Sequence, residues 1–170
     1  RGDDGTTGLL GEGRVEKYDL RMDVLGSIDE TTAALGLARA QSEVVVVKEI
    51  TLQIQRDLYL LMAETAATPE NAERFHSIDA QKVSWLESKT DELNSQVKIP
   101  REFIVPGDTV AGAVLDLART IARRAERFMA ALLARGDVKN MDLLRYLNRL
   151  SSLIFVLEIY ENQKSGKSQV

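Results

Sequence analysis

Apolar residues recur every three or four positions along most of the chain after its first 19 residues, the spacing of one face of an α-helix. The first stretch predicts a helix over 20–41. The second predicts a helix over 44–67, in which Leu58 and Leu61 fall on one face. Pro69 interrupts the pattern, so the second helix must end before it.

Three further helices follow, each marked by residues that start or stop a helix. Ser77 can cap the first of them, and Pro106-Gly107-Asp108 opens the second. Gly136 ends that helix, and Asn140 or Asp142 begins the last one. The predicted ranges are 77–97, 108–135 and 140–163.

Five helices with short loops, and no convincing set of strands, predict an all-α five-helix bundle with ferritin-like up-and-down packing. The whole chain, 1–170, is expected to form one domain. Residues 1–19 are rich in glycine and have little apolar periodicity, so we expect a glycine-rich N-terminal arm there. The bundle would then occupy 20–163, followed by a polar tail over 164–170.

Charge and composition narrow the classes of function. Acidic residues outnumber Lys and Arg, 26 to 22, which disfavours binding of nucleic acid over the whole surface. The chain has no cysteine, which excludes disulfides and thiolate nucleophiles and is ordinary for a cytoplasmic protein. No run approaches 18 apolar residues and no leader opens the chain, so no membrane span or signal peptide is expected.

Arg119, Arg123 and Arg127 follow one another at steps of four residues in the predicted helix 108–135, so they form one stripe. Apolar residues lie opposite, which turns the stripe away from the bundle core. Two interpretations remain open. The charges can form a solvated face with carboxylates such as Glu126, or the planar guanidinium groups can bind phosphate.

The first eight residues are a second candidate for binding phosphate. They read Arg1-Gly2-Asp3-Asp4-Gly5-Thr6-Thr7-Gly8. Glycines let backbone N–H groups approach phosphate oxygens, and Thr or Asp side chains can engage hydrated Mg²⁺. The segment lacks the Gly-Lys-Ser/Thr of a Walker A motif, so a plain turn remains the alternative.

The predicted helix 140–163 is apolar on most sides and should be largely buried. Asn148 and Arg149 interrupt this surface and need polar partners, for which Asp29 and Glu30 are candidates. The two residues are therefore either structural hydrogen-bonding groups or ligand contacts.

In their order and spacing, these segments resemble the signatures of the PduO-type corrinoid adenosyltransferases over almost the whole chain. The motifs that carry the resemblance are Gly2-Asp3-Asp4-Gly5-Thr6-Thr7, Gly26-Ser27-Ile28-Asp29-Glu30, Phe103-Ile104-Val105-Pro106-Gly107, Ala118-Arg119-Thr120, Arg123-Arg124-Ala125-Glu126-Arg127 and Asn148-Arg149-Leu150-Ser151. The fifth and sixth motifs together are specific, whereas the glycine-rich segment alone is not.

The resemblance implies a homotrimer of five-helix bundles, with ATP and Mg²⁺ held between neighbouring subunits. One subunit would contribute Gly2, Asp3, Asp4, Gly5, Thr6, Thr7 and Lys17, and its neighbour Arg123, Arg124, Glu126, Arg127 and Asn148. The resemblance also implies an ion pair between Arg119 and Asp29 across the subunit interface.

The implied reaction is attack of cob(I)alamin on the ribose C5′ of ATP, which yields adenosylcobalamin and triphosphate. Because the cobalt is the nucleophile, no cysteine or histidine is needed. By resemblance, Phe103 packs below the corrin, displaces the lower axial ligand and eases reduction of the cobalt, and it forms the catalytic set with Arg119, Arg123 and Asp29. The alternative is that Phe103 simply plugs the end of the bundle.

The chain departs from the family pattern at three positions. Ser152 stands where the family has Asp, Asp108 replaces a second glycine after Pro106, and Arg1 replaces a threonine. Asp108 is suited to cap the helix that follows it. Ser152 removes a carboxylate from a subunit contact or from the corrinoid side of the site.

Other classes of function fit the sequence less well. Glu73-Arg74-Phe75-His76 matches the Glu-x-x-His motif of ferritin-like metal bundles once, whereas that class needs two copies. No protein-held metal is expected beyond the Mg²⁺ that ATP carries. A non-catalytic corrinoid or nucleotide carrier is the other alternative, although it would not need Arg123, Arg127 and Asn148 for a triphosphate. The enzyme would work in the cytoplasm with a reductase and an adenosylcobalamin-dependent client.

Overall fold

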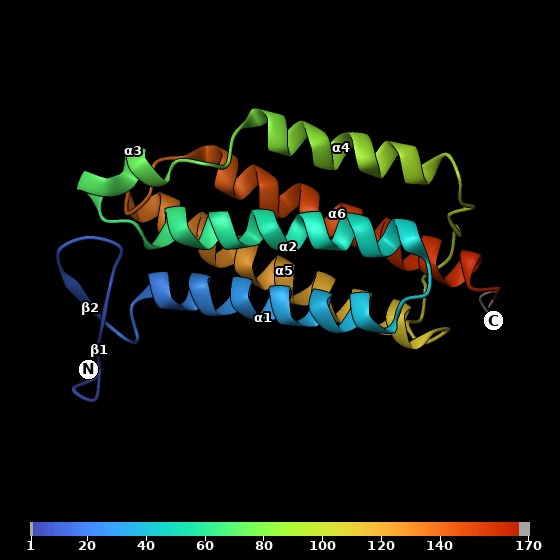
Figure 1. The fold of residues 1–170 in the computed structure, drawn as a ribbon, viewed down its shortest axis with the longest axis horizontal. Helices are drawn as coiled ribbons and strands as arrows, with labels where there is room; N and C mark the ends of the chain where they lie inside the picture. The colour runs from blue at the N-terminus through green and yellow to red at the C-terminus, as the bar shows by residue number, and fades with distance from the viewer. Residues whose placement is uncertain (1, 167–170) are drawn as a thin grey trace.

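The computed structural model describes residues 2–166 of the 170-residue chain. It forms a helical bundle with a short β-hairpin at one end (Figure 1). The expectations for Arg1 and for the polar tail beyond residue 166 lie outside the described residues. The elements are β1 (Thr6–Gly8), β2 (Arg14–Glu16), α1 (Leu20–Gln41), α2 (Val45–Ala66), η1 (Pro69–Asn71), α3 (Ala72–Phe75), α4 (Ala80–Asn94), α5 (Val110–Arg135) and α6 (Met141–Lys164).

Polar side chains start α1, α4, α5 and α6 by accepting hydrogen bonds from the first free backbone N–H groups, whereas α2 begins after Val44 without a side-chain cap. Asp19 accepts from the N–H of Arg21 at the start of α1. Asn140 accepts from the N–H of Asp142 at the start of α6, which decides between the two predicted starts. Gly136 ends α5 in the left-handed conformation, with φ of 80°, as its position predicts.

Two predicted helix starts are wrong. Helix α4 is capped by Asp79, whose side chain accepts from the N–H of Lys82, whereas the Ser77 hydroxyl donates to the Phe75 carbonyl. Helix α5 is capped by Thr109, not by Asp108, whose Oδ2 is buried without a hydrogen-bond partner among the described residues.

Two segments also carry more structure than predicted. The N-terminal arm contains an antiparallel pair of strands, β1 and β2, with Thr7 opposite Val15. The segment between α2 and α4 contains the short helices η1 and α3. Elements of three or four residues are too short to produce a detectable apolar period.

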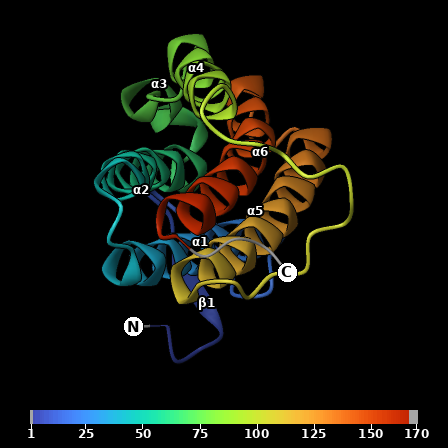
Figure 2. The ribbon, with the colours of Figure 1, turned by 90° about the vertical axis from the view of Figure 1, so that its right-hand side faces the viewer.

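The bundle has the long helices α1, α2, α4, α5 and α6. After α1, each of them runs antiparallel to the long helix before it (Figure 1). Helix α1 packs against α2 and α5, and α6 packs against α5 and α4, which Figure 2 shows along the bundle. The core consists of aliphatic side chains such as Leu58, Leu115 and Leu147, which are fully buried. Among the described residues, no helix has both the length and the apolar character needed to cross a bilayer.

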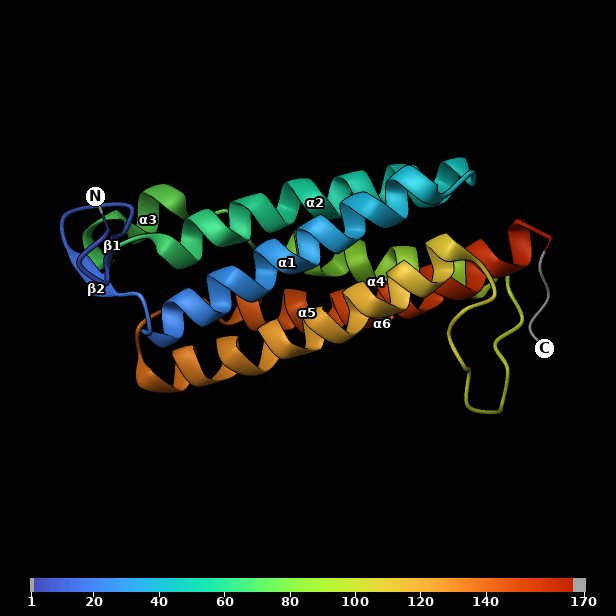
Figure 3. The ribbon, with the colours of Figure 1, turned by 90° about the horizontal axis from the view of Figure 1, so that it is seen from below.

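The two ends of the bundle carry different segments. The hairpin lies at one end, where the N–H of Leu10 donates to the Ala66 carbonyl with 2.8 Å between N and O. The loop 95–109 lies at the other end, where Gln163 of α6 exchanges hydrogen bonds with the backbone of Lys98. Helix α5 runs between these ends (Figures 1 and 3).

Candidate functional site

Helix α5 carries the arginine stripe on its outer face. Ala122 and Ala125 are buried against the bundle, whereas Arg123 and Arg127 are exposed and Arg119 is half-buried. The prediction that the stripe faces away from the core is therefore confirmed. Its guanidinium groups lie where a ligand or a neighbouring subunit can reach them.

The arginines differ in how their charges are neutralised. Arg119 is held by Asp116 of the same helix, with 2.7 Å between Nε and Oδ1. Within residues 2–166, no ion pair is recorded for Arg123 or Arg127, and Arg127 donates to the backbone carbonyl of Arg123 at 3.1 Å. These two cations can therefore bind an anion without first breaking an ion pair.

Asn148 links α6 to the stripe. Its Nδ2 donates to Glu126 Oε1 at 2.7 Å, and its Oδ1 accepts from Arg149 at 2.6 Å. Arg149 in turn donates to Glu87 of α4, with 2.7 Å between Nε and Oε1. The chain of contacts fixes the Glu126 and Asn148 side chains beside the arginines, as a binding site requires.

Asn148 and Arg149 do not contact the partners that were predicted for them from the sequence. Asp29 and Glu30 lie on α1, which packs against α5 rather than α6, so they do not meet these residues. Glu30 instead pairs with Arg124 of α5. Asp29 is exposed, and no partner is recorded for it in the described part of the chain, so its predicted pairing with Arg119 does not form within one subunit.

A groove of about 360 Å³ opens beside the stripe, between α4, α5 and α6. Arg119 and Arg123 lie on one side of it, and Ser152 and Phe155 on another. The departure at Ser152 thus falls in this groove, where a carboxylate would have faced the arginines. The full lining is Thr90, Asn94, Ile99, Arg119, Arg123, Ser151, Ser152, Phe155 and Val156.

The N-terminal arm is an ordered turn. Gly2 and Gly5 have φ of 87° and 82°, a left-handed conformation that side chains with a Cβ rarely adopt. Asp4 Oδ1 accepts from the N–H and the hydroxyl of Thr6 at 3.0 and 2.8 Å, and these hydrogen bonds hold the pKa of Asp4 below its ordinary value. The N–H of Lys17 donates to the Gly5 carbonyl and closes the turn.

The arm does not reach the stripe of its own chain. Asp19, just after the hairpin, pairs with Arg135 at the end of α5, with 3.1 Å between Oδ2 and Nη2. Arg127 and Arg123 lie roughly 12 and 18 Å earlier along that helix. The predicted ATP-binding residues therefore fall into two separate groups within one subunit: the arm, and the stripe with Glu126 and Asn148.

Phe103 lies in the loop 95–109, at the end of the bundle opposite the arm. Its side chain is 91% exposed, and Val105 nearby is 74% exposed. The alternative that Phe103 plugs the end of its own bundle is wrong. Two large apolar side chains exposed close together in one loop are a candidate surface for another molecule to cover.

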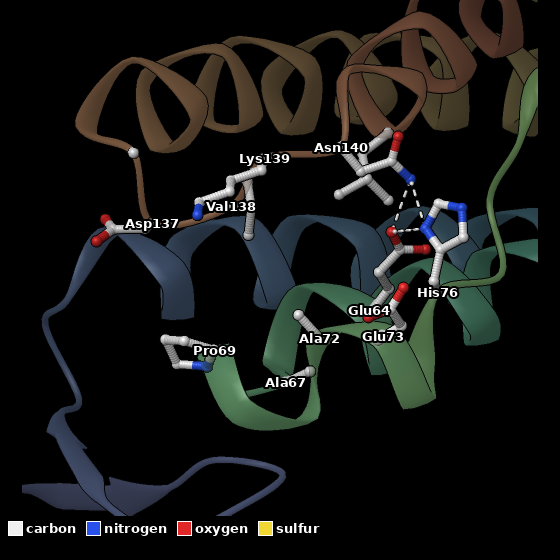
Figure 4. A pocket seen from close by; sticks show the side chains of 12 residues that line it. Glu64, Ala67, Pro69, Ala72, Glu73, His76, Asp137, Val138, Lys139 and Asn140 are labelled. Atoms are coloured by element: carbon white, nitrogen blue, oxygen red, sulfur yellow. Dashed lines mark hydrogen bonds and ion pairs between the residues drawn. The ribbon is translucent and has the colours of Figure 1, made fainter.

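Another pocket, of about 470 Å³, lies at the hairpin end and contains none of the predicted site residues (Figure 4). Glu64 lies at its wall, where Oε1 contacts Asn140 Nδ2 at 2.7 Å and His76 Nδ1 at 3.1 Å. Oε2 accepts from the N–H groups of Ser77 and Ile78 at 2.9 and 3.0 Å. This carboxylate joins α2 to two loops, 76–79 and 136–140, through both of its oxygens, which indicates a structural role.

The motif Glu73-Arg74-Phe75-His76 spans most of the four-residue helix α3 and its end. His76 contacts Glu64, and both line the pocket of Figure 4. Among residues 2–166, no group of three or more His, Cys, Asp or Glu side chains is arranged to hold a metal ion.

Sequence reasoning missed one buried carboxylate near the groove. Glu158 of α6 is 1% exposed, and its Oε1 has no hydrogen-bond partner among the described residues. Burial and the charges of Asp116 and Asp108 raise its pKa to about 7, and Arg119 partly opposes them. The signal was present, because Glu158 alone interrupts the apolar run from Leu153 to Tyr160.

Comparison with known proteins places these features in one family. A family model described as cobalamin adenosyltransferase matches residues 1–161. A corrinoid adenosyltransferase of Bacillus subtilis (strain 168) is 36% identical over 173 residues, covering 99% of this chain and 88% of the relative. The corrinoid adenosyltransferase PduO of Salmonella typhimurium is 33% identical, covering 99% of this chain and 50% of the relative.

A solved structure gives the same result for the fold. It is that of a variant of the PduO-type ATP:corrinoid adenosyltransferase from Lactobacillus reuteri, complexed with cobalamin and ATP. The two structures superimpose with a TM-score of 0.90 at 31% sequence identity, covering 99% of this chain and 94% of the other. The chain therefore belongs to the cobalamin adenosyltransferase family and is of the PduO type.

Proposed function

We propose that this protein transfers the 5′-deoxyadenosyl group of ATP to the cobalt of cob(I)alamin. The electron pair of cobalt(I) attacks the ribose C5′, the carbon–cobalt bond forms, and the C5′–oxygen bond breaks to release triphosphate. The protein must therefore hold two substrates in line and stabilise a highly charged leaving group. The observation that carries the proposal is the outward-facing arginine stripe on α5, beside a groove, in a chain of this family.

Arg123 and Arg127, with Arg124, would bind the triphosphate, because guanidinium groups match phosphate oxygens and keep their charge at every relevant pH. Glu126 and Asn148 would orient the site through their mutual hydrogen bond. Mg²⁺ carried by ATP would add positive charge as negative charge develops on the leaving group. In support, no ion pair is recorded for Arg123 or Arg127 within residues 2–166.

The arm would complete the ATP site of a neighbouring subunit in a homotrimer. The separation of the arm from the stripe within one chain supports this arrangement, because neither group alone encloses a triphosphate. Two arm glycines with positive φ support it as well, since such turns direct successive N–H groups toward an anion. The arm residues assigned to ATP and its Mg²⁺ are Gly2, Asp3, Asp4, Gly5, Thr6, Thr7 and Lys17.

Asp29 and Arg119 would pair between subunits. Asp29 is exposed on α1, and Arg119 sits at the edge of the groove, where its own Asp116 holds it. Arg119 would leave Asp116 and pair with the neighbour's Asp29 when the subunits assemble. Because Arg119 lines the groove, assembly would then change the shape of the groove. If the new pair is buried, removing one partner would cost about 3–5 kcal/mol.

Phe103 would cover the lower face of the corrin and act by exclusion. Its 91% exposure at the bundle end supports this role, because a flat corrin macrocycle that covers the phenyl ring of Phe103 removes apolar surface from water. The apolar contact would keep the lower axial ligand away from cobalt and so ease its reduction. A cytoplasmic reductase would supply the electron, and a client enzyme would take up the adenosylcobalamin.

The test supplies the purified protein with ATP, Mg²⁺, cob(II)alamin and a reductant, and follows formation of the carbon–cobalt bond by absorbance. We expect adenosylcobalamin and one triphosphate per turnover. Absence of product together with absence of ATP binding would overturn the proposal. Binding of cobalamin with no binding of ATP would instead indicate a carrier.

A second variant tests the division of labour. Phe103→Ala should retain the ATP affinity of the wild type and lose most of its turnover, because the residue touches the corrin and not the nucleotide. Val105→Ala, an exposed change in the same loop, is the control. Wild-type turnover in Phe103→Ala would refute the lower-face role.

A further inference from the structure

Glu158 is a buried carboxyl that the proposed reaction does not use. It lies on α6 among Leu157, Ile159 and Tyr160, all of them buried. Its own exposed fraction is 1%, and Oε1 lacks a hydrogen-bond partner within residues 2–166. A carboxyl buried in this way destabilises the fold when ionised, so an effect on function would account for its presence.

The charges that face Glu158 come from α5 and from the residue before its cap. They are Asp116, Arg119 and Asp108, and no charged group of α2 or α4, the other helices on α6, is recorded as acting on it. Asp108 is a second carboxyl with an unpaired buried oxygen, because its Oδ2 has no hydrogen-bond partner among the described residues. Asp116 and Asp108 therefore oppose ionisation of Glu158, whereas Arg119 favours it.

Arg119 connects this buried cluster to the groove. Its Nε donates to Asp116 at 2.7 Å, and the side chain still lines the groove beside Arg123. Val156 and Phe155 line the groove from α6, and Glu158 is buried within one turn of them on the same helix. A change of charge at Glu158 thus acts on Arg119 through protein interior, where electrostatic forces are weakly screened.

We propose that Glu158 is a positioning residue for Arg119: with its proton off, the carboxylate holds the guanidinium inward, and with its proton on, it lets Arg119 move toward the groove. The inference rests on the proposed function, because it assigns Arg119 a role in the corrinoid site. Burial and the charges of Asp116 and Asp108 raise the pKa of Glu158 to about 7, so the change falls in the physiological range.

The direction follows from the charges. When Glu158 is ionised, Arg119 is attracted inward by Glu158 and held by Asp116. When Glu158 is protonated, one of these attractions is lost, and the neighbouring subunit's Asp29 or the corrinoid competes more effectively for the guanidinium. Binding of cobalamin should therefore weaken as pH rises through 7, whereas ATP contacts Arg123 and Arg127 and should respond little.

The experiment measures the KM for cobalamin and for ATP between pH 6 and 8.5 in wild type, Glu158→Gln and Glu158→Asp. In the wild type, the KM for cobalamin should rise by about fivefold, the lower end of measured couplings between linked sites. Glu158→Gln should keep the low-pH value throughout, and Glu158→Asp should retain a rise. The KM for ATP should change less than about twofold in all three proteins.

Two controls make the outcome decisive. Glu92→Gln changes an exposed carboxylate of α4 and should leave the wild-type curve intact. Asp108→Asn removes one charge that raises the pKa of Glu158, so the rise should move to lower pH; it decides the matter if Glu158→Gln does not fold. Curves for Glu158→Gln or Asp108→Asn that follow the wild type would overturn the inference. A wild type that makes no adenosylcobalamin at any pH would refute the proposed function instead.

Discussion

Glu64 and Glu158 are both buried carboxyls in the same bundle, and they are treated in opposite ways. Glu64, 7% exposed at the hairpin end, contacts two side chains through Oε1 and two backbone N–H groups through Oε2. Glu158, 1% exposed behind the groove, has an oxygen without a partner in the described residues and two acidic neighbours. Folding has satisfied one carboxylate and left the other unsatisfied.

The difference separates the part of the molecule that holds the fold from the part that holds substrate. At the hairpin end, Glu64 at the wall of the 470 Å³ pocket has partners for both of its carboxylate oxygens. Beside α5, Arg123 has no recorded ion pair and Asp108 no partner for Oδ2 within residues 2–166. Polar groups left incomplete in a well-packed protein are typical of a functional site. The larger pocket is therefore the less informative one.

The largest effect is expected beside α5, where polar groups lack partners among the described residues. Arg123→Ala should lower turnover by about 100- to 1000-fold, the usual loss when one preorganised donor to a developing anion is removed. The protein should remain folded, because this side chain is exposed and no ion pair is recorded for it among the described residues. Steady-state rates of adenosylcobalamin formation would measure the loss.

Arg145→Ala is the matched control for Arg123→Ala. Arg145 is also exposed on a long helix, but it pairs with Asp142 at 2.8 Å, away from the groove. It should retain wild-type turnover. Equal losses in both variants would mean that exposed arginines act through the fold, and the contrast between the two regions would fail.

The sequence was sufficient for the long helices and for the stripe, for physical reasons. Apolar residues at helical spacing determine which face of α5 is buried, so the exposure of Arg123 followed directly. The cap at Thr109 was not predictable, because its hydroxyl also donates to Asn162 Oδ1 at 2.7 Å, a contact between residues far apart in the chain.

The partners of polar side chains were the least predictable feature. Asn148 meets Glu126, and Glu30 meets Arg124, because α5 lies between α1 and α6. Residue spacing describes one helix and gives no information on which helices become neighbours. The assignments that depend on a second subunit, such as Asp29 with Arg119, remain predictions for the same reason.

The next largest effect is expected at the hairpin end, where both oxygens of Glu64 have partners. Glu64→Gln should lower the free energy of unfolding by about 3 kcal/mol, because the amide brings an NH₂ group against N–H donors that need an acceptor. Chemical denaturation would measure the change. Glu73→Gln, in the same pocket but exposed, should change stability by less than about 0.5 kcal/mol. Turnover of the folded Glu64→Gln protein should remain near the wild type.

Glu158→Gln should instead raise the free energy of unfolding. The pKa of Glu158 is raised from 4.5 to about 7, so between these values the unfolded chain loses a proton that the folded protein keeps. Wild-type stability therefore falls as pH rises through this window and levels off above 7. Glu158→Gln has no proton to lose, so it should lack this fall and exceed wild-type stability by about 2 kcal/mol at pH 8.

Denaturation curves at pH 5, 6, 7 and 8 for wild type, Glu158→Gln and Glu64→Gln would decide the comparison. The gain from Glu158→Gln should grow from pH 5 to 7 and then stay constant, because the difference in bound protons ends there. A Glu158→Gln protein less stable than wild type at pH 8 would mean that the carboxylate has hidden partners. Glu158 would then hold the fold as Glu64 does, and the buried cluster would lose its link to the groove.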